Sequence, residues 1–320
     1  MRDHGGNFDE AITRFGGTPP DWIDLSTGIN RVPYPMPPLP AEAWSALPTR
    51  SEINALHRIA QIAYATNAKI IALSGAQAAI QLIPRLSPPG QARVLGPTYN
   101  EHAAALRLAG WQVREVQDFN DLAGADLAVV VNPNNPDGIQ HSPVDLLDLR
   151  SKVGRLVVDE SFADADPALS VASQAGEGLI VLRSFGKFYG LAGLRLGFAL
   201  GTEKDIAALA DMAGPWPVSG AAIVIGSKAL QDRAWIAATQ KRLAEDALAL
   251  DTLAARAGWA LIGGCALFRT YATPDAAGAQ NHLATHQIWS RIFPYSNSWL
   301  RLGLPGSPAE WAKLGKTIAQ

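Results

Sequence analysis

A single lysine stands among aromatic and small residues in the stretch from Arg183 to Arg195. Lys187 has no acidic neighbour there, so partial burial would favour its uncharged amine, which can attack an aldehyde. Ser184 precedes the lysine and Arg195 follows it, and a hydroxyl and a guanidinium that converge on one point suit a phosphate. Taken alone, this stretch also fits a surface lysine in a glycine-rich loop.

Two polar side chains stand just past apolar runs that are typical of buried strands. Asp159 follows Leu156 to Val158, and a half-buried carboxylate there can hold a proton on a pyridine nitrogen, although Asp is also a common helix cap. Asn135 lies in the loop from Asn132 to Gly138. Its amide could face a phenolic oxygen, although Asn, Pro and Gly also make ordinary turns.

Three more segments carry candidate binding groups. Gly75, Ala76 and Gln77 join a strand to a helix, where free backbone amides can cradle a phosphate or simply form a connecting loop. Tyr99 could stack on a flat ring or pack in the core. Arg301 lies inside an apolar strand, which indicates a buried carboxylate held in a fork or a structural salt bridge.

Short apolar strands alternate with helices over the first two thirds of the chain. Strands are predicted at 69–73, 92–95, 111–116, 126–131, 155–158, 179–182 and 196–200, and helices at 52–66 with Ser51 as cap, 76–86, 101–109 and 143–153. This alternation predicts an α/β fold with a mostly parallel sheet flanked by helices. Such sheets bind ligands at the carboxyl ends of their strands, where the candidate residues stand.

The pattern changes after about residue 203. A long helical region to about Arg256, broken near 214–217, precedes predicted strands at 260–262, 266–270 and 299–302 and helices near 281–292 and 308–318. These elements predict a smaller C-terminal α+β domain. Residues 17–48 are rich in proline and glycine and predict an irregular arm. The predicted domains are 1–48 (arm and part of the small domain), 49–213 (large domain) and 214–320 (linking helices and small domain).

The composition excludes several classes of function. With 48% hydrophobic and 18% charged residues and a net charge of −2, the chain is typical of a globular protein of one or two domains. It has no Lys/Arg-rich run for nucleic acid and no apolar stretch long enough for a bilayer. Neither a secretory signal nor a metal site is expected. Cys265 is the only cysteine, which suits a reducing, cytoplasmic compartment.

Taken together and in this order, these residues resemble the fold-type I pyridoxal-phosphate (PLP) enzymes of the aspartate aminotransferase superfamily. The resemblance spans almost the whole chain and implies a PLP-transferase-like fold with PLP as cofactor. It implies that Lys187 holds PLP as an imine, that Asp159 pairs with the ring nitrogen and that Asn135 faces the ring oxygen. The other implied contacts are the phosphate ligands Ser184, Arg195, Gly75, Ala76 and Gln77, the stacking ring of Tyr99 and the carboxylate anchor Arg301.

Within that superfamily the chain is most similar to the threonine-phosphate decarboxylases of cobalamin biosynthesis. The similarity rests on the segments 4–7, 24–30, 97–102 and 299–305. It implies decarboxylation of L-threonine O-3-phosphate to (R)-1-aminopropan-2-yl phosphate and CO2. It also implies that His4, Gly28 and Arg291 join Asn135 and Arg301 in binding a small phosphorylated amino acid, and that the protein is a homodimer with shared sites.

Other functions stay open at this stage. Histidinol-phosphate aminotransferases share most of the cofactor motif, so transamination of a phosphorylated amino acid is the main alternative. Phe162 stands where such transaminases usually have a tyrosine, which favours the decarboxylase, and Leu47 replaces a tyrosine often offered to the partner subunit's phosphate. A PLP-sensing regulator would need a DNA-binding segment, and the sequence shows none. Phosphothreonine and phosphoserine differ by one methyl group, worth about 1–3 kcal/mol, and are not distinguished.

Overall fold

A computed structural model describes residues 4–7 and 9–319. The chain divides into two compact units: a large unit (Tyr34–Asn135 and Gln140–Ile236) and a small unit (Met1–Pro33, Pro136–Ile139 and Ala237–Gln320). The sequence prediction placed the boundaries at 48/49 and 213/214 instead. Helix α9 (Gly220–Gln231) lies beyond residue 213 yet belongs to the large unit, because it packs along α3 (Arg50–Ala63).

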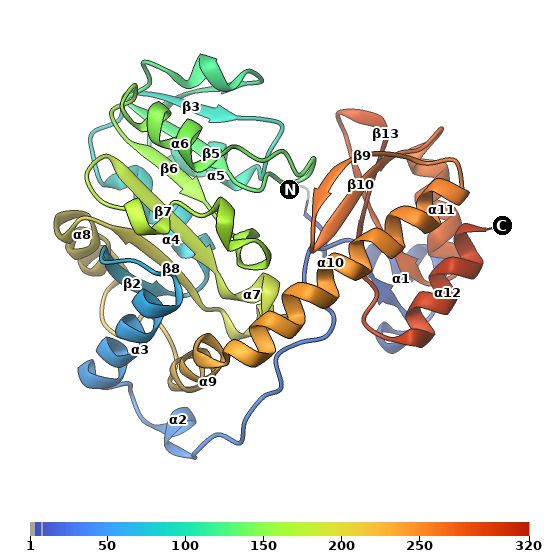
Figure 1. The fold of residues 1–320 in the computed structure, drawn as a ribbon, viewed down its shortest axis with the longest axis horizontal. Coiled ribbons are helices and arrows are strands. Elements are labelled where there is room, and N and C mark those ends of the chain that lie inside the picture. Colours follow the sequence, from blue (N-terminus) through green and yellow to red (C-terminus); the bar gives the residue numbers. More distant parts are fainter. Residues whose placement is uncertain (1–3, 8, 320) are drawn as a thin grey trace. The chain divides into compact units, whose positions relative to one another are not determined.

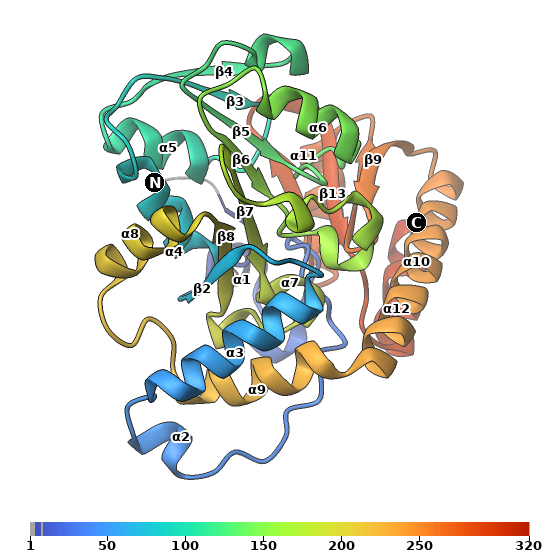
Figure 2. The ribbon, with the colours of Figure 1, turned by 60° about the vertical axis from the view of Figure 1, so that its left-hand side comes forward.

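The large unit is built on a seven-stranded sheet with helices on both of its faces (Figure 1, Figure 2). The strand order is β2-β8-β7-β6-β5-β3-β4. Strand β8 is antiparallel to both of its neighbours, and the other neighbouring strands are parallel. The strands are β2 Lys69–Leu73, β3 Gln91–Leu95, β4 Gln112–Val116, β5 Leu127–Val131, β6 Leu156–Asp159, β7 Leu179–Ser184 and β8 Gly197–Gly201. The predicted α/β fold with a mostly parallel sheet is confirmed.

The central strands are buried because their sequences are apolar throughout. Strand β5 reads LAVVV and every residue in it is buried, as expected for a strand covered on both faces. Side chains of α4, α5 and α8, including Ile80, Leu106 and Leu209, pack in one cluster with strand residues such as Leu182. The helices of this unit are α2 Glu42–Ser45, α3, α4 Ala76–Leu82, α5 Glu101–Leu108, α6 Pro143–Arg150, α7 Phe185–Phe188, α8 Glu203–Ala213 and α9.

Helix α3 begins before the predicted cap. Thr49, not Ser51, is the N-cap, because its hydroxyl accepts the Glu52 backbone N–H at 3.3 Å while the Glu52 carboxylate accepts the Thr49 N–H at 2.7 Å. This reciprocal pair is a capping box. The prediction of Ser51 as the cap was wrong, because the Thr-x-x-Glu spacing from Thr49 to Glu52 favours a cap two residues earlier.

The small unit contains a four-stranded antiparallel sheet and a short two-stranded parallel one. The four-stranded sheet has the order β12-β13-β10-β9, with bounds Arg291–Phe293, Ser296–Gly303, Phe268–Ala272 and Ala260–Cys265. Its helices are α1 Asp9–Phe15, α11 Ala276–Thr285, α12 Pro308–Ile318 and the greater part of α10 (Arg233–Arg256). No helix in the described part of the chain has the length and apolar character needed to cross a membrane.

Two sequence predictions for the small unit were wrong. Helix α11 ends at Thr285, and the predicted helix near 281–292 is replaced by β11 (Ile288–Trp289) and β12. Strand β11 pairs in parallel with β1 (Ile23–Asp24), inside the segment predicted as an irregular arm. Ile288 is fully buried in this pairing, opposite Ile23.

Candidate active site

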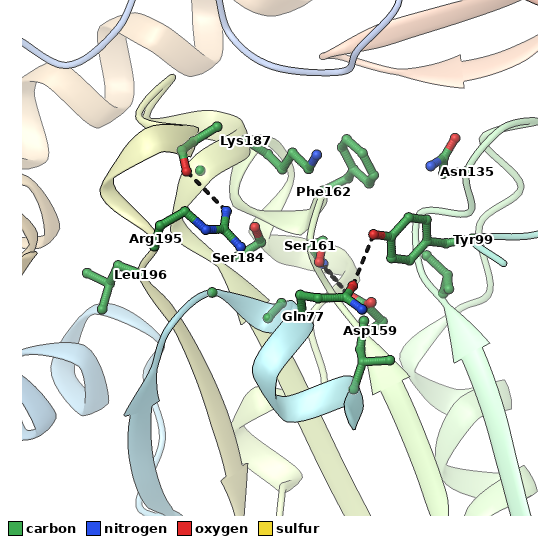
Figure 3. Close-up of a pocket in the computed structure, with 16 residues that line it drawn as sticks. Gln77, Tyr99, Asn135, Asp159, Ser161, Phe162, Ser184, Lys187, Arg195 and Leu196 are labelled. Atoms are coloured by element: carbon green, nitrogen blue, oxygen red, sulfur yellow. Dashed lines mark hydrogen bonds between the residues drawn. The ribbon is translucent and has the colours of Figure 1, made fainter. Parts of the chain in front are cut away.

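A pocket lies at one edge of the large unit's sheet, where the parallel strands end (Figure 3). Because β8 runs antiparallel, its first residues and the loop before it reach the same edge. The lining residues are Gly75, Ala76, Gln77, Ile80, Tyr99, Val131, Asn135, Asp159, Ser161, Phe162, Ser184, Gly186, Lys187, Ala192, Arg195 and Leu196. All nine cofactor contacts that the sequence predicts are among them.

Lys187 belongs to the short helix α7, which follows β7 directly. The first and last residues of this helix, Phe185 and Phe188, are fully buried and anchor it in the core. The Phe185 ring stacks on the Tyr189 ring with 4.2 Å between the centroids. The Lys187 side chain is half-buried, and its Nζ lies 5.6 Å from the centroid of the Phe162 ring (Figure 3). The structure therefore places a primary amine on a rigid support at the pocket wall.

Asp159 is the last residue of β6, and the residue as a whole is 2% exposed. One carboxylate oxygen lies 2.8 Å from His102 Nε2, and the other accepts the Ser161 backbone N–H at 2.9 Å and the Ser161 hydroxyl. Burial alone would raise the pKa of Asp159, but the bonds from His102 and Ser161 outweigh it and hold that pKa below its ordinary value. The pocket thus contains a buried negative charge.

Sequence reasoning missed both partners of Asp159. His102 stands one helical turn after Tyr99, a spacing that puts both side chains on one face of the segment. Ser161 stands two residues after the aspartate, the spacing at which an Asp side chain accepts from its own backbone. These two spacings are the signals by which both residues could have been found.

Gly75, Ser184 and Arg195 form the positively charged end of the pocket. Gly75 has φ +81°, and a Cβ there would lie 2.8 Å from Arg195 Nη2. Any residue other than glycine would therefore displace the guanidinium from this position. Arg195 is exposed and donates from Nη1 to the Ala192 carbonyl at 3.1 Å. Within the described residues it forms no ion pair. Backbone amides, a hydroxyl and a guanidinium without a carboxylate partner are the donors that hold phosphates.

Asn135 reaches the pocket from a loop that other asparagines hold in place. The Asn132 side-chain amide donates to the His141 carbonyl at 3.0 Å and accepts the His141 N–H at 2.9 Å. Asn134 accepts the Thr98 hydroxyl at 2.6 Å. The Asn132 and Asn134 side chains thus bond within the protein, whereas the Asn135 side chain lines the pocket (Figure 3).

A buried ion cluster next to the pocket was also missed by sequence reasoning. Arg183 pairs with Glu160 at 2.6 Å and with Asp164, and its guanidinium lies 4.4 Å from the centroid of the Tyr64 ring. Burial opposes the charge on Arg183, but Asp164 and Glu160 raise the pKa of the guanidinium above its ordinary value. Since Glu160 and Arg183 neighbour Asp159 and Ser184 in the chain, the cluster fixes the ends of β6 and β7.

The predicted carboxylate anchor, Arg301, lies in the small unit. It is a buried residue of β13 and stands directly across from Arg291 of β12. Its Nη2 donates to the Ser26 carbonyl at 2.6 Å, and its guanidinium lies 5.2 Å from the centroid of the Phe268 ring. Burial and then the Arg291 charge lower the pKa of Arg301 to about 10. Two like charges opposite each other destabilise a sheet unless an anion lies between them.

The remaining predicted substrate residues also belong to the small unit. His4 is exposed and Gly28 is buried. The segment after His4 approaches the 24–30 loop closely, because a Cβ on Gly5 would lie 2.5 Å from the Ser26 carbonyl oxygen. The pocket therefore gathers the predicted cofactor residues in the large unit, while His4, Gly28, Arg291 and Arg301 are residues of the small unit. The described residues contain no cluster of three potential metal ligands.

The chain is similar to known proteins over its full length. It is 44% identical to the threonine-phosphate decarboxylase of a Sinorhizobium species and 42% identical to that of Pseudomonas aeruginosa, in both cases over 99% of this chain and 97% of the relative. Its fold matches the histidinol-phosphate aminotransferase of Sinorhizobium meliloti, solved in complex with pyridoxal-5'-phosphate, with a TM-score of 0.81, 19% identity and coverage of 98% and 94%. A family profile for aminotransferase class I and II matches residues 46–317. The chain therefore belongs to the class I and II aminotransferase family.

Proposed function

We propose that this protein is a PLP-dependent lyase that converts L-threonine O-3-phosphate to (R)-1-aminopropan-2-yl phosphate and CO2. The observation that carries the proposal is the single pocket edge at which an amine, a buried carboxylate and a phosphate cradle meet. The full-length identity to two threonine-phosphate decarboxylases supports the choice of substrate. Because the product is an aminopropanol phosphate, the enzyme serves cobalamin biosynthesis.

The pocket residues fit PLP on two independent observations. A Cβ at residue 75 would lie 2.8 Å from Arg195 Nη2, so glycine at this position lets the guanidinium lie directly beside the start of α4, where a phosphate would bind. The lowered pKa of Asp159 keeps a negative charge where a protonated ring nitrogen needs one. Arg195, Ser184 and the backbone amides of Ala76 and Gln77 would hold the phosphate, with Gly75 beside them, because the Gly75 N–H already donates to the Leu73 carbonyl at 2.6 Å. Asp159, Asn135, Tyr99 and Lys187 would contact the ring and its aldehyde carbon.

Bound PLP supplies an electron sink that stabilises negative charge at the substrate Cα. Asp159 keeps the ring nitrogen protonated, and His102 and Ser161 keep Asp159 ionised. Lys187 Nζ, half-buried above the Phe162 ring, is the group that gives a proton to Cα or takes one from it. Phe162 has no hydroxyl, so Asn135 is the side chain that faces the ring oxygen.

The substrate carboxylate and phosphate decide which bond at Cα breaks. Arg301 anchors the carboxylate, and a strong grip there opposes loss of CO2. The substrate phosphate, bound by His4, Arg291 and the backbone amides near Gly5, therefore supplies orienting binding energy that does not depend on the leaving group. The cross-strand position of Arg291 and Arg301 supports two anion contacts in one place.

A direct assay tests the reaction. Purified protein is incubated with PLP and O-phospho-L-threonine without any keto acid, and CO2 is measured. We expect stoichiometric release of CO2 and of the amino phosphate. Amino transfer that requires 2-oxoglutarate, without CO2, would instead indicate an aminotransferase on a phosphorylated amino acid such as histidinol phosphate. O-Phospho-L-serine in the same assay measures the selectivity for the methyl group.

We also propose that the protein is a cytoplasmic homodimer. Apolar side chains are exposed in two segments of the large unit: Trp44 and Leu47, which are 72% and 63% exposed, and Trp216, which is 51% exposed. Exposed apolar surface of this kind is typical of a protein interface. Light scattering on the purified protein is expected to give twice the 34.0 kDa chain mass, and Trp44→Glu with Trp216→Glu is expected to give monomers. The lone Cys265 suits the reducing cytoplasm.

A further inference from the structure

Glu101 is a buried carboxylate that does not line the pocket. It is the first residue of α5 and is 6% exposed. Its Oε2 accepts the side-chain amide of Gln77 at 3.0 Å and that of Gln81 at 3.5 Å, both from α4. Burying a carboxylate is costly unless hydrogen bonds compensate for the lost water. Two glutamine amides aimed at one oxygen provide that compensation.

The contact with Glu101 fixes which way the Gln77 amide points. A glutamine side chain has a donor end and an acceptor end, whereas a carboxylate only accepts. With its nitrogen on Glu101, Gln77 presents its Oε1 to the pocket, and that oxygen accepts the Tyr99 hydroxyl at 3.0 Å (Figure 3). The two hydrogen bonds of the series Glu101–Gln77–Tyr99 therefore run in one direction, from the Tyr99 hydroxyl to Gln77 and from Gln77 to the accepting oxygen of Glu101.

We propose that Glu101 is a positioning residue for the cofactor: through Gln77 it orients the Tyr99 ring that covers PLP. The inference rests on the proposed function, since it assumes that PLP occupies this pocket. It explains why a carboxylate is buried beside the pocket without touching it. It also links the phosphate cradle to the stacking ring, because Gln77 belongs to the first and holds the second.

A double-mutant cycle on cofactor affinity tests the proposal. The dissociation constant of PLP is measured by absorbance titration, without substrate, for the unchanged protein, Glu101→Gln, Tyr99→Phe and the double variant. Glu101→Gln keeps the size and shape of the side chain. Because a glutamine can donate as well as accept, the Gln77 amide is then free to rotate and exchange the positions of its oxygen and nitrogen. Each single variant is expected to bind PLP about three- to tenfold more weakly, the usual effect of one lost hydrogen bond. The double variant is expected to be no weaker than either single one, because both changes break the same series of bonds.

Glu115→Gln is the matched control. Glu115 is half-exposed on β4 and pairs with Arg107, so the same chemical change there is expected to leave the PLP affinity unchanged. A thermal melt of each apoprotein separates lost positioning from lost folding. Glu101→Asp is the second variant, because aspartate keeps an acceptor-only side chain. It is expected to bind PLP more tightly than Glu101→Gln does. If the glutamine variant does not fold, the aspartate variant takes its place in the cycle.

Two outcomes overturn the proposal. If the effects of the Glu101 and Tyr99 changes multiply in the double variant, the residues act independently. If Glu101→Gln lowers the melting temperature but leaves the PLP affinity unchanged, Glu101 is only a structural residue. Both results are distinct from a failure of the proposed function, which would appear as no release of CO2 from O-phospho-L-threonine by the unchanged protein while PLP still binds.

Discussion

His102 Nε2 lies 2.8 Å from Oδ2 of Asp159, and each of these side chains is 3% exposed. Asp159 lines the pocket, and His102 contacts it from outside the pocket lining. Together with Ser161 it accounts for the lowered pKa of Asp159.

Removal of the His102 ring nitrogen is expected to narrow the pH range of the enzyme. In His102→Phe the pKa of Asp159 rises, because burial then acts against fewer stabilising bonds. The acid limb of kcat/KM therefore moves to higher pH. Ser161→Ala is expected to move it in the same direction. An unchanged acid limb in both variants would show that Asp159 does not control the pH dependence.

Gly75→Ala is expected to weaken PLP binding because the added methyl group would displace the Arg195 guanidinium, an effect separate from the backbone strain of the substitution. Gly75 and Gly124 both have φ +81°, but a Cβ at Gly124 meets nothing within 4 Å, whereas one at Gly75 meets Arg195. Each substitution is expected to lower the free energy of unfolding by about 1 kcal/mol through strain. Only Gly75→Ala is expected to raise the dissociation constant of PLP, by about tenfold or more. Equal PLP affinities in the two variants would contradict the assignment of the cradle.

His57 is expected to make the protein less stable in mild acid. Its Nε2 accepts the Ala72 N–H at 3.0 Å, and burial lowers the pKa of the ring to about 4 from an ordinary 6.5. The folded state therefore binds fewer protons than the unfolded state, so this contribution is complete above pH 6.5 and is lost as the pH falls towards 4. The loss amounts to about 3 kcal/mol.

Urea unfolding at several pH values checks this effect, with His57→Gln as the comparison. Glutamine keeps an acceptor but does not take up a proton in this range. The stability of the variant is expected to fall less steeply between pH 6.5 and pH 4 than that of the unchanged protein. Parallel pH curves for the two proteins would rule out His57 as the titrating group.

Lys187→Ala is expected to lower turnover strongly while leaving the fold intact. The lysine is half-buried on α7 and is not part of the hydrophobic core, so its truncation costs little stability. Loss of a group that transfers protons lowers kcat by about a hundredfold to ten-thousandfold. The visible absorbance of a protein-bound PLP imine is expected to disappear, and unchanged absorbance would place the imine on another lysine. Lys69, exposed on β2, is a suitable control for the same change.

The sequence predicts the large unit's sheet closely because the strands are continuous apolar runs. Strand β2 has the predicted bounds, and β5 differs by one residue at its start. The candidate site was predictable for the same reason: polar residues that follow such strands, as Asp159 and Asn135 do, must meet at one edge. Neither His102 nor Glu101 was assigned a role, because each contacts a site residue from outside the pocket lining. The spacing of His102 from Tyr99 was a signal for the first, whereas the contact of Glu101 with Gln77 of α4 is seen only in the folded structure.

The small unit was less predictable. The strands β1 and β11 have two residues each, too few for any periodic pattern, and they pair across most of the chain. Without that pairing, the apolar residues near Ile288 fit a helix equally well. The roles of Arg291 and Arg301 came from resemblance, and only the β12–β13 register shows that the two stand opposite each other.

The pairing of Ile23 with Ile288 also sets the order in which the protein can be completed during synthesis. Every residue of the large unit has left the ribosome once Ile236 emerges, so that unit can fold while the rest is still being translated. The N-terminal segment must wait for almost the entire chain before its partner strand exists. A message truncated shortly before codon 288 would thus yield a protein with a finished lysine pocket and an N-terminal strand that has nothing to pair with.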